Sequence, residues 1–121
     1  MHNAIFHFRI AGKPFIKIVN GSKIRIVKLD DDKLKRIKYG DLIVFEKLPD
    51  IERRITTRVI DVQKFNCFEN LYSHYALREF GIDENKTIRD VVKGMYKTHS
   101  RAQELENGVL CIKIELVWPS S

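Results

Sequence analysis

Residues 21–41 read GSKIRIVKLDDDKLKRIKYGD, and this stretch decides how the chain folds. It begins at a glycine turn, continues as a short apolar segment with basic residues along it, crosses three aspartates and ends on Gly40-Asp41. Alternate residues of an extended strand share a face. One face of the segment 23–29 therefore carries Ile24, Ile26 and Lys28, and the other carries Arg25, Val27 and Leu29. The stretch predicts a strand between two turns.

Positive charge is concentrated around this stretch. Between Lys13 and Lys38 the chain has nine lysine or arginine residues and three aspartates, so this segment accounts for the whole net charge of +6. A regional basic face raises the local concentration of polyanions such as nucleic acid. A solvated basic surface with no polyanionic partner would explain the same pattern.

The remaining composition excludes several classes of protein. A length of 121 residues fits a single domain, residues 1–121, and no apolar run reaches the roughly 18 residues of a membrane helix. The start lacks a signal-peptide pattern, so we expect a cytoplasmic protein. Cys67, Cys111 and the four histidines lack the spacing of metal ligands, and helix capping explains the aspartates at 30–32. We expect no metal and no cofactor, and the sequence leaves the oligomeric state open.

Strands are expected on both sides of the decisive stretch. Residues 3–10 alternate enough to predict a first strand, and a short helix from Pro14 should stop at Asn20-Gly21. Residues 30–38 predict a loop with one turn of helix. Strands at 42–45 and 53–62 are joined by a short turn, which predicts a hairpin.

Two helices and a closing strand follow. Asn66 and Glu69 form a capping-box pattern, and the apolar spacing after them predicts a helix that ends at Gly81. Thr87 starts a second amphipathic helix that reaches Tyr96, and residues 97–107 should be irregular or loosely helical. Residues 109–118 show a clear period of two, with Trp118 expected to close the inward face.

This order of elements predicts an α+β fold. The helices come as a pair and no βαβ alternation is sustained, which argues against a doubly wound sheet. We expect a small, partly closed β-barrel of five to six strands with flanking helices.

The motif residues resemble those of the ASCH domain family, which has a PUA-like β-barrel. Gly21, Lys23, positions 26 and 28, and Gly40-Asp41 follow the order of the family's G-x-K-x-x-E-x-R motif and downstream Gly-Asp pair. Further matches are Lys64-Phe65, Phe68-Glu69, Met95-Tyr96, Ser100, Gln103-Glu104 and 108–110. The chain is similar to the small single-domain bacterial members, but its motif is degenerate. Ile26 replaces the family's glutamate and Lys28 replaces its arginine.

The resemblance implies RNA binding in a cleft between the barrel and the early helix. We therefore predict a noncatalytic module that binds RNA or a nucleotide in a basic cleft. Lys28 keeps the charge of the family's arginine but loses its two-pronged geometry. The residues expected to contact phosphates are Lys23, Arg25, Lys28, Lys35, Arg36 and Lys38, with Tyr39 as a platform on which a base could stack.

Two other functions stay open. One branch of the family deacetylates N4-acetylcytidine with a lysine, a threonine and a glutamate. Lys23 matches the lysine, Ile26 stands where the threonine should be, and the acid would come from the region of Glu79, Asp83 and Glu84. We assign no catalytic residue, because Ile26 cannot act as a nucleophile. A protein-interaction domain that uses an apolar surface around Ile24 and Ile26 is the third possibility.

Overall fold

The structure, a computed structural model, describes residues 3–31, 34 and 36–117. Its elements in chain order are β1 (Ile5–Ile10), α1 (Gly12–Val19), β2 (Arg25–Leu29), β3 (Leu42–Lys47), β4 (Arg54–Phe65), α2 (Phe68–His74), the 3-10 helix η1 (Leu77–Glu79), α3 (Ile88–Met95), α4 (Arg101–Asn107) and β5 (Val109–Leu116). No helix within these ranges is long and apolar enough to cross a membrane.

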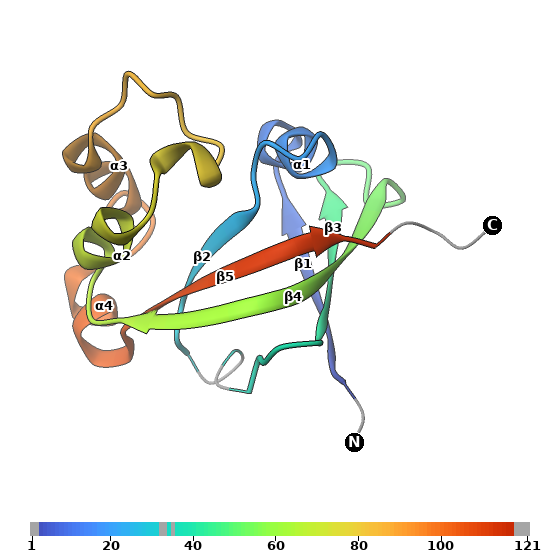
Figure 1. Cartoon of the computed structure of the whole chain (residues 1–121), viewed down its shortest axis with the longest axis horizontal. Helices are drawn as coiled ribbons and strands as arrows, with labels where there is room; N and C mark the ends of the chain where they lie inside the picture. The colour runs from blue at the N-terminus through green and yellow to red at the C-terminus, as the bar shows by residue number, and fades with distance from the viewer. Residues whose placement is uncertain (1–2, 32–33, 35, 118–121) are drawn as a thin grey trace.

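The strands form one curled sheet in the order β1-β3-β4-β5-β2. β1 pairs in parallel with β3, and the other neighbours are antiparallel, including the β3–β4 hairpin that the sequence predicts. In Figure 1 helix α1 lies at the top of the sheet, whereas α2, α3 and α4 gather at its left. The predicted α+β fold with a partly closed barrel is therefore confirmed, with five strands among the described residues.

Apolar side chains fill two separate cores, one on each face of the sheet. The core inside the curl contains Ile26, Ile112 and side chains of α1, β1 and β3. The other core lies between the sheet and the helices and contains Phe68, Leu71 and Cys111. Strand β5 contributes to both, because alternate residues of a strand point to opposite faces. The inward face predicted for Leu110, Ile112, Ile114 and Leu116 is confirmed, and Trp118 lies outside the described residues.

Helix α2 is shorter than its periodicity predicts. It ends at His74 and does not continue to Gly81, because Tyr75 has extended backbone angles (φ −127°, ψ 162°). This geometry brings the Tyr75 ring beside Phe65, with 5.9 Å between the ring centroids, and over the guanidinium of Arg25, 3.9 Å from the ring centroid. Contacts made far along the chain thus override the local helical pattern.

The predicted capping box at Asn66 is also wrong. The N-cap of α2 is Cys67, whose side chain makes no capping hydrogen bond. The carboxylate of Glu104 replaces it and accepts a hydrogen bond of 2.8 Å from the backbone N–H of Phe68. Glu104 belongs to α4, a regular helix in the segment predicted as irregular or loosely helical, and Ser100 and Gln103 form its capping box. The cap predicted at Thr87 is confirmed, since its side chain accepts from the N–H of Asp90.

Candidate functional site

Lys23 occupies the junction between α1 and β2. Helix α1 ends at Val19 with Asn20 as its C-cap, and Gly21 takes a positive φ of 82°, which glycine adopts without steric strain. The chain then turns back, so that the N–H of Lys23 donates to the carbonyl oxygen of Lys17 at 2.9 Å. Lys23 forms an isolated bridge with Phe80, and β2 begins only at Arg25. The strand predicted from residue 23 therefore starts two residues later.

Two lysine side chains meet the backbone that follows η1. The Nζ of Lys23 donates to the carbonyl oxygen of Phe80 at 3.0 Å, and the Nζ of Lys17 donates to that of Gly81 at 2.6 Å. Both acceptors are neutral, so neither offsets the positive charge. Within the described part of the chain, no carboxylate forms an ion pair with Lys23.

The surroundings make protonation of Lys23 unfavourable. Burial, followed by the nearby charges of Lys17 and Lys28, lowers its pKa from 10.5 to about 8. A cation removed from water without an opposite charge is costly to the folded state. At neutral pH a group with this pKa is still about nine-tenths protonated. At neutral pH Lys23 is therefore mostly charged, although its buried surroundings disfavour the charged form.

Lys23 lies between two cavities. One, of about 360 Å³, is lined mainly by apolar side chains of β4, β5 and the residues around α1, including Ile60 and Ile114. The other, of about 110 Å³, includes Lys28 and the apolar side chains of Ile26 and Phe45. Ile18 and Lys23 line both. The structure thus brings Lys23 and Lys28 to one cavity, with the Lys28 ammonium 4.4 Å from the centroid of the Phe8 ring.

Arg25 is turned away from both cavities. Its side chain is buried on the opposite face of β2, with Nε 3.4 Å from a carboxylate oxygen of Glu79 and the guanidinium over the Tyr75 ring. Its Nη1 also lies 3.9 Å from the sulfur of Cys111. Arg25 therefore ties β2 to the helical side of the molecule and is not placed to contact a phosphate.

The other predicted site residues lie at the opposite end of β2. Arg36, Lys38 and Tyr39 follow that strand on the loop to β3, whereas Lys23 precedes it. All three are exposed, and Tyr39 is 72% exposed. Lys35 lies outside the described residues. The six predicted residues that the structure describes therefore do not form one cluster.

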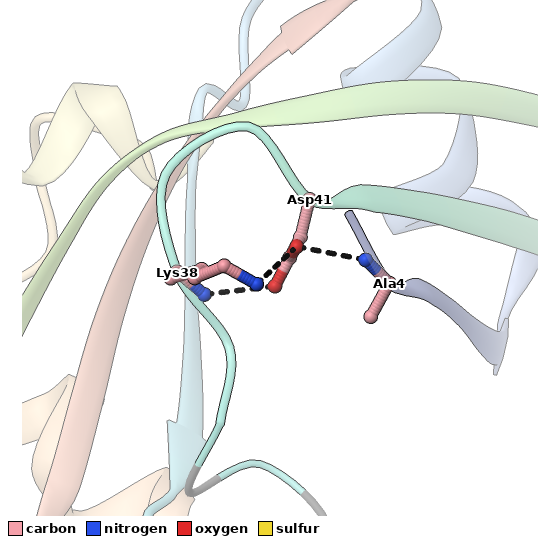
Figure 2. A network of polar contacts seen from close by, with 3 residues as sticks. All are labelled: Ala4, Lys38 and Asp41. Carbon is pink, nitrogen blue, oxygen red and sulfur yellow. Dashed lines mark hydrogen bonds and ion pairs between the residues drawn. The ribbon is translucent and has the colours of Figure 1, made fainter. Parts of the chain in front are cut away.

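Asp41, the motif's second turn residue, has a structural role. Its fully buried carboxylate accepts hydrogen bonds of 2.9 Å from the backbone N–H groups of Ala4 and Lys38 (Figure 2). The ammonium of Lys38 adds a contact of 3.4 Å. Gly40 precedes it with a φ of 90°. The Gly-Asp pair thus fixes the start of β3 against the start of the chain.

The residues needed for the amidohydrolase chemistry are dispersed. Ile26 is 4% exposed and belongs to the core inside the curl. Glu79 is engaged by Arg25, while Asp83 and Glu84 line a separate cavity of about 260 Å³ together with Lys17. The described residues also contain no group of histidine, cysteine or acidic side chains suited to a metal ion.

Two contributors to the site could not be recognised in the sequence. Lys17 reads as a basic residue in the last turn of a short helix, which is common at helix C-termini. Phe80 contributes its backbone carbonyl, which every residue type has, so the sequence cannot indicate this role. Their partner Lys23 is 57 residues before Phe80, so only the fold brings them together.

Comparisons with known proteins identify the fold. No family model and no curated protein sequence matches the chain significantly. Among solved structures, the hypothetical protein PH0355 matches with a TM-score of 0.82 and 22% identity over 93% of this chain and 99% of that one. A protein of Pyrococcus furiosus, solved by NMR in solution, matches with a TM-score of 0.72, 22% identity and coverage of 93% and 97%.

A third match carries the name that the motif suggests. The ASCH domain of Lactobacillus crispatus JV V101 matches with a TM-score of 0.65 and 12% identity, over 93% of this chain and 79% of that one. This chain therefore has the fold of that ASCH domain, as its degenerate motif predicts.

Proposed function

We propose that this ASCH-like chain acts as one noncatalytic domain that binds RNA or a nucleotide beside Lys23. The observation that carries the proposal is the partly buried Lys23 side chain, which lines two cavities and, among the described residues, has a neutral carbonyl as its only hydrogen-bond partner. A charged group held in such surroundings is typical of a binding or catalytic site. An anionic ligand would supply the missing counter-charge.

The two cavities suit different parts of a nucleotide. The apolar cavity of about 360 Å³ falls within the size range of small-molecule pockets and suits a flat base. Lys23 and Lys28, which line the smaller cavity, offer ammonium groups for phosphate oxygens, and Lys17 adds a third positive charge nearby. A phosphate-bearing ligand would account for the regional basic charge. RNA is an intracellular ligand, so we propose a cytoplasmic location.

Contacts with the loop at the far end of β2 would distinguish RNA from a free nucleotide as the ligand. A nucleotide would contact only the cavities, whereas a strand of RNA could continue along β2 to Arg36, Lys38 and Tyr39. We therefore expect Tyr39→Ala to weaken the binding of RNA and to leave the binding of a mononucleotide unchanged.

A salt titration with a short fluorescent oligouridylate tests the proposal. Wild-type protein should bind at low ionic strength, and the logarithm of the affinity should fall linearly with the logarithm of salt concentration. Lys23→Gln should weaken binding by about tenfold and make this slope shallower, since one phosphate contact contributes roughly 0.7 to it. Lys13→Gln, at an exposed position of α1, is the control. Equal effects of the two substitutions, or no binding at low salt, would refute the proposal.

One observation favours an amidohydrolase as the second candidate. A lysine with a pKa of about 8 can exchange protons near neutral pH, which acid–base chemistry requires. The test is to incubate the protein with N4-acetylcytidine and to measure cytidine by chromatography. Release of cytidine that disappears in Lys23→Ala would establish the enzyme, and no release above the rate without protein would exclude this substrate.

A further inference from the structure

A groove on the helical side of the molecule takes no part in the Lys23 site. It has a volume of about 480 Å³, exceeds either cavity beside Lys23 and shares no lining residue with them. Helices α2, α3 and α4 all contribute to it, and in Figure 1 these helices gather apart from α1. The groove is therefore a separate surface, and its occupant need not be the ligand of Lys23.

The floor of the groove is an apolar stripe that the fold covers incompletely. Ile88 and Val92 of α3 and Tyr96, its C-cap, follow each other at intervals of four residues and line the groove. They pack against the helical core, yet not one residue of α3 is fully buried. An apolar stripe on a helix is normally covered by a neighbouring element. The apolar side chains of α3 are thus only partly covered by the rest of the chain and keep some apolar surface exposed in the groove.

The rim of the groove is basic. Arg89 and Lys93 lie one turn apart on α3, and Arg101 stands at the start of α4. All three side chains are exposed. The lining residues include a single acid, Glu69 on α2. The groove therefore combines an apolar floor with a net positive rim, and complementary charge favours an occupant that is both acidic and apolar.

A nucleic acid fits this groove less well than a peptide. The aromatic ring in the floor, Tyr96, is covered on one face by the guanidinium of Arg101, 4.9 Å from the ring centroid. Its edge contact with Phe68 has a centroid distance of 5.9 Å, and its hydroxyl donates to Glu104 at 2.7 Å. One face of the ring is therefore already occupied by a protein side chain, which makes it a poorer platform for a base than the free ring that single-stranded RNA requires. What remains in the floor is aliphatic.

We propose that this groove docks a short acidic segment of a partner protein that carries large apolar side chains. The apolar side chains would lie on Ile88 and Val92, and flanking aspartates or glutamates would pair with Arg89 and Lys93. This mode of recognition, with apolar anchors in a groove and charges at its edge, is common for peptide segments. The proposal does not depend on the function of Lys23.

A random-peptide phage library tests the proposal. The selection is run in parallel against the wild type and against Arg89→Gln/Lys93→Gln, which removes two rim charges while keeping good helix formers in α3. A matched control, Lys86→Gln/Lys97→Gln, removes two exposed lysines that do not line the groove. Circular dichroism of the three proteins checks that the helices are intact.

The expected result is a set of peptides retained by the wild type and the control but not by the rim variant. These peptides should be rich in aspartate or glutamate around leucine, isoleucine or phenylalanine. One such peptide, synthesised and labelled, should bind the rim variant about tenfold more weakly than the control. Its NMR titration should shift the methyl signals of Ile88 and Val92.

Three results would overturn the proposal. The selection could yield no peptide that distinguishes the rim variant from the control. The distinguishing peptides could lack acidic residues. Oligouridylate, titrated in parallel, could shift the methyl signals of Ile88 and Val92 while the selected peptide does not, which would make the groove part of a nucleic-acid surface.

Discussion

Lys23 opposes folding at neutral pH. Its pKa is lowered from 10.5 to about 8 in the folded chain, so between these values the unfolded chain binds more protons. The resulting loss of folding stability is full below about pH 8 and disappears as the pH rises through 10.5, the pKa of the lysine in the unfolded chain. Lys23→Met should therefore raise the free energy of unfolding at neutral pH by up to about 3 kcal/mol, as judged from the pKa difference.

Urea denaturation at several pH values measures this gain. Lys13→Met on the exposed side of α1 should change stability by less than about 0.5 kcal/mol. A Lys23→Met protein that is less stable than the wild type at neutral pH would show that Lys23 is structural, because its hydrogen bond to Phe80 would then outweigh the cost of its charge.

The same pKa predicts how ligand binding depends on pH. An anion binds the protonated lysine, so affinity should be nearly constant below about pH 8 and fall by up to tenfold for each unit above it. Lys23→Arg keeps its charge at high pH and should remove this dependence. Anisotropy titrations of labelled RNA at a series of pH values measure the effect, and identical profiles for the two proteins would assign the titration to another group.

At the scale of elements, α2 depends on a carboxylate from a different helix. Glu104 accepts from the N–H of Phe68 and from the hydroxyl of Tyr96, so it joins α2, α3 and α4. Glu104→Gln removes the charge and one acceptor and should lower the free energy of unfolding by about 1–2 kcal/mol. Glu106→Gln, exposed on the same helix, should have almost no effect in the same urea denaturation. Equal stabilities of the two variants would contradict this role.

Two glycines should respond in opposite directions to the same substitution. Gly81 has a φ of 73°, and a Cβ there would lie 3.1 Å from side-chain atoms of Lys17 and Lys23. Gly81→Ala should therefore destabilise the fold by about 1–2 kcal/mol and weaken binding at Lys23. Gly94 is a helical glycine of α3 with open space around it, so Gly94→Ala should stabilise by about 0.5–1 kcal/mol. Thermal unfolding of both variants tests the contrast.

The caps of α2 and α3 differ in how well they can be predicted from the sequence. The cap of α3 could be predicted, because Thr87 and Asp90 are three residues apart and both belong to a known local pattern. The cap of α2 could not, since Glu104 is 36 residues from Phe68. Local patterns therefore fix where most elements begin, while contacts between distant residues decide where α2 ends and what satisfies its first N–H.

At the scale of the whole molecule, Asp41 connects the start of the chain to its middle. Asp41→Asn can supply only one acceptor oxygen for the two backbone N–H groups that the carboxylate now satisfies. We expect a loss of about 1–3 kcal/mol in unfolding free energy. Amide hydrogen exchange should accelerate in β1 more than in β5. Asp83→Asn, exposed on a loop, is the control, and uniform acceleration over the sheet would show that β1 is not released on its own.

The topology explains why the residues that the sequence predicts for the site do not all lie together. The motif is continuous in sequence, but β2 separates Lys23 from Lys38 and Tyr39 and turns Arg25 to the opposite face. The parity of the strand could predict that Arg25 and Lys28 point apart. That Arg25 would be enclosed depends on α2 and η1, which lie more than 40 residues further along the chain. A linear motif thus identifies the fold better than it identifies the ligand surface.

The position of β2 at the sheet's edge has a consequence for how the protein is made. β2 is completed at Leu29, yet its neighbour in the sheet is β5, which begins at Val109. While the ribosome synthesises the intervening chain, the basic strand beside Lys23 has no partner. Pairings of such large sequence separation form late and slowly. The cavities beside Lys23 are therefore unfinished through most of the synthesis of the described chain, and β5 completes them.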